Sequence, residues 1–376
     1  MKFAAFCGLA WLVFAAPASA SGFASFNAGI LAHNNADADG AIKSFTLAIT
    51  APDLAPQLRA IAFLDRGEAY AMNGDFERAI SDYSSSLALT PDDYTALNHR
   101  GALHVLRREY GPAHADFVAA IRARPELATA YAHDGQVYMA EQNYEDALRL
   151  FSNGLAASWY TLNFYLDRSE AYRASGRYAE AITEDDTALV RDKTFAAAVL
   201  ERGRARRDSG DLRGAMSDFK TASDMASDDP DFQLALGIAQ WEGGQYDDAI
   251  RSFKRASGDF EQTRYAFIWL YLTNTKEREP DSRLPGKAAK LADPKWPGPI
   301  VGLIANSATA DQVFAAAKES DIGLRQCEAN FYVGEWQLAQ QNLLEGKRLL
   351  DAATQVCIPF SAEFNAAKID LKRLPS

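Results

Sequence analysis

Histidine and cysteine are the residues of this 376-residue chain best suited to bind a metal, and their spacing gives little support for a metal site. No histidine forms a metal-ligand spacing with another histidine or with a cysteine. His99 and His133 are 34 residues apart, which would bring them close on adjacent helices. We favour a polar surface stripe over a shared metal ion there. The histidines are His33, His99, His104, His114 and His133.

The sequence also lacks the motifs of common enzyme classes. It contains no serine-nucleophile motif, no glycine-rich phosphate loop and no pair of carboxylates in a pocket-forming context. The acidic run Glu184-Asp185-Asp186 lacks the glycine and the alternating oxygen ligands of a calcium loop. We therefore predict no catalytic residue, no cofactor and no metal site.

A 34-residue period organises most of the chain. A small residue recurs at this interval, with an alanine twelve residues later and usually a ring sixteen residues later. The small residues are Gly67, Gly101, Gly135, Ser169, Gly203 and Gly237. The alanines are Ala79, Ala113, Ala147, Ala181, Ala215 and Ala249. The residues at the ring place are Tyr83, Phe117, Phe151, Asp185, Phe219 and Phe253.

This pattern resembles the tetratricopeptide repeat (TPR), a helix-turn-helix of 34 residues. Small residues let two helix backbones approach, and the rings fill the gaps between hairpins. Each hairpin leaves one face bare, so the resemblance implies an all-α, right-handed superhelix. An earlier unit around Gly29 and Phe45 makes about seven repeats from residue 23 to 261, with about four extra residues near positions 51 to 56.

Two departures from the pattern fall in neighbouring repeats. Asp185 occupies a ring place, and Arg206 occupies the tyrosine place of the next repeat. One interpretation is that the two side chains pair in the partly buried seam between the repeats. The other is that both are solvated on an irregular repeat, and both interpretations stay open.

The last third of the chain is helical but interrupted by proline. Five prolines lie from Pro280 to Pro299, and a final unit places Gly334 at the small position. A helix from about Ser361 to Leu371 would cap the array. The predicted organisation is a signal peptide, a TPR superhelix, a proline-interrupted connecting segment, and a TPR-like hairpin with its capping helix, over residues 1–20, 21–263, 264–323 and 324–376.

The order of these parts resembles the NlpI-type envelope proteins. The distinctive residues are WLYL at Trp269 to Leu272, the segment WPGPIVGLI, and EANFYVGEW from Glu328 to Trp336. The resemblance implies a periplasmic adaptor, often a homodimer, that docks a peptidoglycan hydrolase or an envelope protease. NlpI is itself a lipoprotein, and the present chain lacks the lipid-attachment signal, so the resemblance does not extend to a membrane anchor.

The N-terminus has the pattern of a secretory signal peptide. Lys2 precedes an apolar run, and the small residues Ala18-Ser19-Ala20 follow it. Cleavage after Ala20 predicts a soluble protein exported to the bacterial periplasm. Loss of Lys2 moves the net charge from -11 to -12, and such an acidic chain gives no reason to expect nucleic acid as a partner. The remaining cysteines, Cys327 and Cys357, lie at the same end of the final hairpin and predict a disulfide.

The expected binding surface is the concave groove, which the first helix of each hairpin lines. Its predicted polar residues are Asn98, Gln136, Glu170, Arg173, Arg204, Arg207 and Trp241. Its apolar lining is Leu64, Met72, Val105, Met139, Leu166, Leu200, Leu234 and Ile238. The arginines would hold a carboxylate of a bound segment, and Trp241 would take an apolar side chain. Alternatively, the arginines only balance Glu170, Glu201 and Asp208.

We therefore favour a scaffold that binds a protein or peptide. The rival hypotheses are an enzyme with its site in segment 275–323 and a self-assembling structural protein of the envelope. Fold alone does not separate a scaffold from an enzyme.

One mass measurement tests both expectations about processing. Protein purified from the envelope should begin at Ser21, carry no lipid, and take up a thiol reagent at Cys327 and Cys357 only after reduction. A chain that retains residues 1–20, a lipid adduct, or two thiols that react without reduction would contradict the corresponding expectation.

Overall fold

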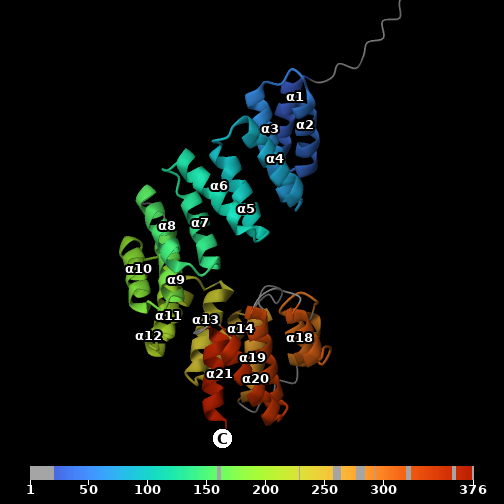
Figure 1. Cartoon of the computed structure of the whole chain (residues 1–376). Coiled ribbons are helices and arrows are strands. Elements are labelled where there is room, and N and C mark those ends of the chain that lie inside the picture. The colour runs from blue at the N-terminus through green and yellow to red at the C-terminus, as the bar shows by residue number, and fades with distance from the viewer. Residues whose placement is uncertain are drawn as a thin grey trace, which may run out of the picture. The chain divides into compact units, whose positions relative to one another are not determined.

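The computed structural model describes residues 21–158, 162–227, 229–256, 264–276, 284–291, 293–318, 323–357 and 361–374. Helices joined by turns make up these residues, with no strand among them, so the all-α prediction is confirmed (Figure 1). The chain divides into two compact units: unit 1 ends at Phe164 and unit 2 begins at Tyr165. The domain boundaries from the sequence stay predictions.

Unit 1 contains four antiparallel hairpins. Aspartate or asparagine side chains accept backbone N–H groups at the start of several helices, including Asp75 before α4 and Asp93 before α5. The helices are α1 (Gly22–Asn34), α2 (Ala38–Thr50), α3 (Pro56–Met72), α4 (Phe76–Leu89), α5 (Tyr94–Leu106), α6 (Tyr110–Ala123), α7 (Thr129–Ala140) and α8 (Tyr144–Ala157).

Unit 2 continues with three more hairpins of the same kind. They are formed by α9 (Asn163–Ala174), α10 (Tyr178–Arg191), α11 (Ala196–Asp208), α12 (Leu212–Met225), α13 (Pro230–Glu242) and α14 (Tyr246–Ala256). The proline-interrupted segment supplies α15 (Arg264–Lys276), α16 (Leu284–Leu291), α17 (Gly298–Ile304) and α18 (Ala310–Lys318). The final hairpin and the closing helix are α19 (Gly323–Ala339), α20 (Leu343–Val356) and α21 (Ala362–Arg373).

The small residue of each repeat faces the ring that follows sixteen residues later. A Cβ added at Gly101 would lie 2.7 Å from Cε1 of Phe117, and one at Gly67 would lie 2.7 Å from Cε1 of Tyr83. Both rings are buried. The ring therefore packs directly against the backbone of the first helix, as the repeat pattern predicts.

In the fifth repeat, two polar side chains make the contact that a glycine and a ring make in the other repeats. Ser169 Oγ hydrogen-bonds to Asp185 Oδ2 at 2.8 Å, and both residues are buried. Arg206 instead donates to Asp218 at 2.7 Å. The proposed pairing of Asp185 with Arg206 is therefore wrong, because the ring place points into its own hairpin. The solvated alternative is also wrong for Asp185.

An arginine-carboxylate pair joins the two helices of several hairpins. Arg66 donates from Nε and Nη2 to Asp82 at 2.7 and 2.8 Å, and Arg100 does the same to Asp116 at 2.8 and 2.6 Å. Such two-point pairs fix the relative rotation of the helices. The sequence signal was an arginine just before the small residue and an aspartate just before the ring, and the period analysis missed it.

A residue with a positive φ forms the turn inside several hairpins. Gly74, Gly176, Gly210 and Gly244 all have φ between 74° and 93°, where glycine is favoured. Arg108 and Gln142 occupy the equivalent place in their repeats with φ of 58° and 60°. The turn conformation thus persists where glycine is absent.

The final hairpin and closing helix also appear where the sequence places them. Gly346 of α20 packs against Leu338 of α19. The Sγ atoms of Cys327 and Cys357 lie 2.13 Å apart, with their Cα atoms 4.6 Å apart, within the usual range for a disulfide. Ser361 caps α21 by accepting the N–H of Phe364.

Adding one methyl group should test the glycine-ring contact. We expect Gly101→Ala to lower the free energy of unfolding by about 1 to 3 kcal/mol, because the new methyl group overpacks against Phe117. Gly286→Ala in α16 is the matched control, because its added Cβ meets no atom within 4 Å. Urea unfolding followed by circular dichroism measures both. Equal midpoints for the two variants would contradict the packing argument.

Candidate functional site

The first helices of the hairpins in unit 1 share a line of polar contacts. Glu68 on α3 lies 3.4 Å from Nε2 of His33 on α1 and 3.1 Å from Nδ1 of His99 on α5. On α7, Nδ1 of His133 lies 3.1 Å from Oδ1 of Asn98 on α5. These contacts connect α1, α3, α5 and α7 into one face, which we call the inner face of unit 1.

His99 and His133 belong to this face and also pack against rings. Their ring centroids lie 5.8 Å from that of Tyr83 and 5.5 Å from that of Phe117, respectively. Burial, and then the proximity of His99, lower the pKa of His133, which favours its neutral form. No group of three or more His, Cys, Asp or Glu side chains in the described part of the chain could hold a metal ion.

Exposed apolar side chains accompany the polar line. Met72 and Leu106 end α3 and α5, are 34 residues apart, and are 56% and 65% exposed. Gln136, a predicted groove residue, is also exposed, whereas Asn98 is buried against His133. Apolar groups exposed together beside polar ones are typical of a contact surface.

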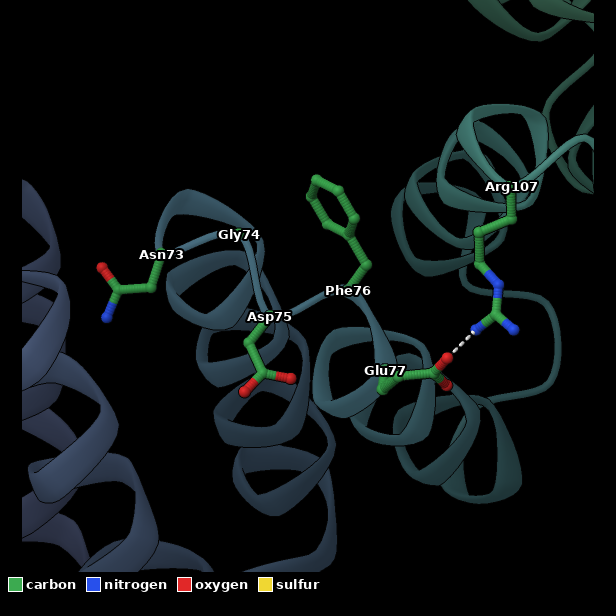
Figure 2. A pocket seen from close by; sticks show the side chains of 6 residues that line it. All are labelled: Asn73, Gly74, Asp75, Phe76, Glu77 and Arg107. Atoms are coloured by element: carbon green, nitrogen blue, oxygen red, sulfur yellow. Dashed lines mark ion pairs between the residues drawn. The ribbon is translucent and has the colours of Figure 1, made fainter. Parts of the chain in front are cut away.

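An open cleft of about 480 Å³ is lined in part by Asn73 and Arg107, which directly follow Met72 and Leu106 in the sequence. Figure 2 shows its lining, with the Phe76 ring standing apart from the ion pair between Glu77 and Arg107. Arg107 Nη1 lies 2.6 Å from Glu77 Oε1. Phe76 is 37% exposed, so the cleft offers a ring as well as a neutralised charge pair. Its lining is Asn73, Gly74, Asp75, Phe76, Glu77 and Arg107.

The predicted arginine cluster lies in unit 2, where its charges are already paired. Arg173 Nη1 lies 3.0 Å from Asp208 Oδ2, and Arg207 Nη2 lies 3.1 Å from Asp208 Oδ1. Arg204 pairs with Glu201 at 2.5 Å. The contacts therefore follow the interpretation in which nearby acids balance the arginines.

Trp241 does not line an open groove. Its side chain is fully buried, and its ring lies 5.3 Å from that of Trp269 and 6.2 Å from that of Tyr246. The expectation that it takes a partner's side chain is therefore corrected. Its position in the repeat correctly places it on a first helix, but α15 packs over it.

The residues of the predicted apolar lining differ in how deeply they are buried. Leu64, Leu200 and Ile238 are buried, and Met72 is exposed. The half-buried members are Val105, Met139, Leu166 and Leu234. Among the polar members, Glu170 is exposed.

A second open cleft, of about 470 Å³, lies in the segment where the enzyme hypothesis placed its site. Asp293 is the charged residue of its lining, and Arg264 pairs with it. Ser307 Oγ donates to the carbonyl of Gly302. Within the described part of the segment, Asp293 is therefore paired with a cation, and the Ser307 hydroxyl is engaged by the backbone.

Sequence reasoning missed a buried ionic cluster in unit 2. Lys276 Nζ lies 2.7 Å from Glu335 Oε2 and 2.5 Å from Asp370 Oδ2. Burial raises the pKa of Glu335 to about 8, and burial raises that of Glu242 on α13 to about 7. The only sequence signal was the acidic residue inside the apolar run FYVGEW.

Comparison with known proteins identifies the repeats as tetratricopeptide repeats. A family model described as tetratricopeptide repeat matches residues 26–94, 64–128, 134–197 and 200–261. A tetratricopeptide repeat protein from Parabacteroides merdae is similar in structure, with 19% identity, a TM-score of 0.55, and coverage of 66% of this chain and 98% of that chain. The C-terminal part of a TPR repeat-containing protein from Cytophaga hutchinsonii has 15% identity, a TM-score of 0.52, and coverage of 65% and 99%.

Curated proteins give no match to this chain. The described helices include none that is both long and apolar enough to span a bilayer.

The buried acid of the fifth repeat should make stability depend on pH. Burial raises the pKa of Asp185 from 3.8 to about 8, partly offset by its hydrogen bond to Ser169. The folded state therefore binds a proton that the unfolded state releases, so the free energy of unfolding falls as pH rises from about 4 to about 8. Asp185→Asn should lose this contribution, which is at most about 1.4 kcal/mol per pH unit. Urea unfolding at several pH values measures it, and identical slopes for both proteins would contradict the assignment.

Proposed function

Because the chain belongs to the tetratricopeptide-repeat family, we propose that it is a non-enzymatic scaffold that binds a protein or peptide segment on the inner face of unit 1. The observation that carries this proposal is the pair Met72 and Leu106, exposed at equivalent places of adjacent repeats. Burying each side chain under a partner contributes about 1.5 to 3 kcal/mol.

The polar line of this face supplies specificity. Glu68 and the histidines beside it accept or donate hydrogen bonds, and Gln136 is exposed on the next first helix. The cleft at Phe76 would receive a ring or an aliphatic side chain at the edge of the bound segment. The partner is therefore a segment with apolar residues spaced to reach Met72, Leu106 and Phe76.

The arginine cluster of unit 2 remains a second binding proposal. Arg204 is its most accessible member, with a side chain 37% exposed, and a partner carboxylate would compete there with Glu201. Arg207 has a side chain only 11% exposed. This competition makes the cluster the weaker of the two surfaces.

The setting we propose is the bacterial envelope. The signal-peptide pattern over residues 1–20 and the resemblance to NlpI-type proteins support export, and the approach of Cys327 to Cys357 suits an oxidising compartment. A peptidoglycan hydrolase or an envelope protease is the partner class that the resemblance supports, with the chain as a monomer or a homodimer.

Charge placed on the inner face should abolish partner binding. We expect the double variant Met72→Asp, Leu106→Asp to lose the proteins that wild type captures by crosslinking in the native envelope, because two carboxylates would be desolvated in the interface. Val190→Asp on α10 is the matched control, because Val190 is 81% exposed on a second helix.

A parallel variant, Arg204→Ala with Arg207→Ala, tests the second surface. Unchanged capture by the Met72, Leu106 variant with loss in the arginine variant would move the site to unit 2. Unchanged capture by both would refute binding on the first helices.

A further inference from the structure

The closing helix α21 packs across first helices of unit 2 as well as on the hairpin before it. It contacts α19 and α20, which precede it, and also α13, which is more than 100 residues earlier. Figure 1 shows α21 in red beside α13 and α19. Through Asp370 it reaches Lys276 on α15 as well. The helix therefore covers a surface formed by α13, α15 and α19, which we call the α21 seat.

Polar contacts hold α21 on this seat along its length. Tyr332 donates to Glu363 Oε1 at 2.9 Å near the start of the helix. Asp370 accepts from Lys276 at 2.5 Å in the last turns. Arg373 donates to the hydroxyl of Tyr246 at the end. Buried charged groups regain much of their hydration when such contacts open, so the net cost of opening is smaller than the number of contacts suggests.

The apolar part of the contact consists of half-buried side chains, including Phe364 and Leu371, and of fully buried alanines. The fully buried apolar residues of α21 are two alanines, Ala366 and Ala367. By contrast, α19 buries Phe331, Tyr332 and Val333 almost completely. Because hydrophobic stabilisation scales with the apolar area buried, α21 is held less firmly than the helices it covers.

The seat also contains polar atoms that α21 leaves without a protein partner. These atoms are Glu242 Oε1 and Glu335 Oε1, and their residues are 7% and 2% exposed. Buried polar groups in a surface built for one permanent neighbour are normally satisfied. Two such atoms, one on α13 and one on α19, indicate that the seat is not fully matched to α21.

We propose that α21 is an exchangeable internal ligand, and that the α21 seat binds a helix of a protein partner when α21 leaves it. The partner is a short amphipathic helix that presents a carboxylate to Lys276, small residues at the close contact, and amide or cationic donors to Glu242 and Glu335. α21 meets this description in part, since Asn365 hydrogen-bonds to Glu242. This proposal adds a second binding surface to the proposed scaffold function. It rests on that function only in assuming that the chain has a protein partner.

The variant Asp370→Ala removes one contact between α21 and its seat. It should leave the folding of the seat and the helicity of α21 largely unchanged. Lys276 keeps Glu335 as an ion-pair partner, and alanine has a higher helix propensity than aspartate. Lys372→Ala is the matched control, because Lys372 is an exposed charged residue on the same helix. Both variants are made in the full-length chain, with α21 retained.

Hydrogen exchange read by mass spectrometry tests the release. In Asp370→Ala, the amides of α21 should exchange about tenfold faster or more than in wild type, while those of α19 and α20 stay unchanged. Lys372→Ala should behave as wild type. Equal acceleration of α19 and α21, or no acceleration of α21, would show that α21 is a permanent part of unit 2 and would refute the proposal.

A labelled peptide of residues 361–374 tests the vacated seat. Fluorescence anisotropy should show it binding Asp370→Ala about tenfold tighter or more than wild type, because less of the seat is occupied. The same peptide with Asp370→Ala should bind weakly. No binding, or equal binding to both proteins, would refute exchange. Neither measurement involves Met72 or Leu106, so failure here leaves the proposed function of unit 1 standing.

Discussion

The packing of a ring against a backbone that carries no side chain is the contact on which each repeat depends. The Phe117 ring occupies the space that a Cβ on Gly101 would need, and the Tyr83 ring is placed in the same way against Gly67. This contact sets how closely the helices of a hairpin approach. Arg100 and Asp116, one residue before each member of the first pair, then fix the rotation of the helices. Placement of side chains on the first helices follows from these two constraints.

The fifth repeat shows what the constraint tolerates. Ser169 and Asp185 replace the glycine and ring with a hydrogen bond, and the helix pair still forms. The replacement costs a buried carboxyl that stays protonated near neutral pH, since burial raises the pKa of Asp185 to about 8. The geometry of the hairpin is thus kept. The stability of this repeat should depend on pH through Asp185, whereas the neighbouring repeats have a ring at this position.

The repeat period predicts the helices, their turns and the side of each hairpin on which a residue lies, because these depend on residues close in sequence. The predicted groove included Met72 but not Leu106, which lies 34 residues later, and the structure leaves both exposed. The repeat period fails for Trp241, because the covering side chain of Trp269 comes from a segment outside the period. The ionic cluster of Lys276, Glu335 and Asp370 was beyond sequence reasoning for the same reason.

The two units differ in what lies on their first helices, and this difference bears on function. In unit 1, exposed apolar side chains remain at Met72 and Leu106, and burying them requires a partner. In unit 2, acids balance the arginines, and α21 covers α13 with polar contacts as well as half-buried apolar ones. An apolar surface contributes affinity in proportion to its buried area, whereas a polar surface contributes mainly selectivity. This difference supports the proposal that unit 1 holds a partner and that unit 2 discriminates among partners by whether they can replace α21.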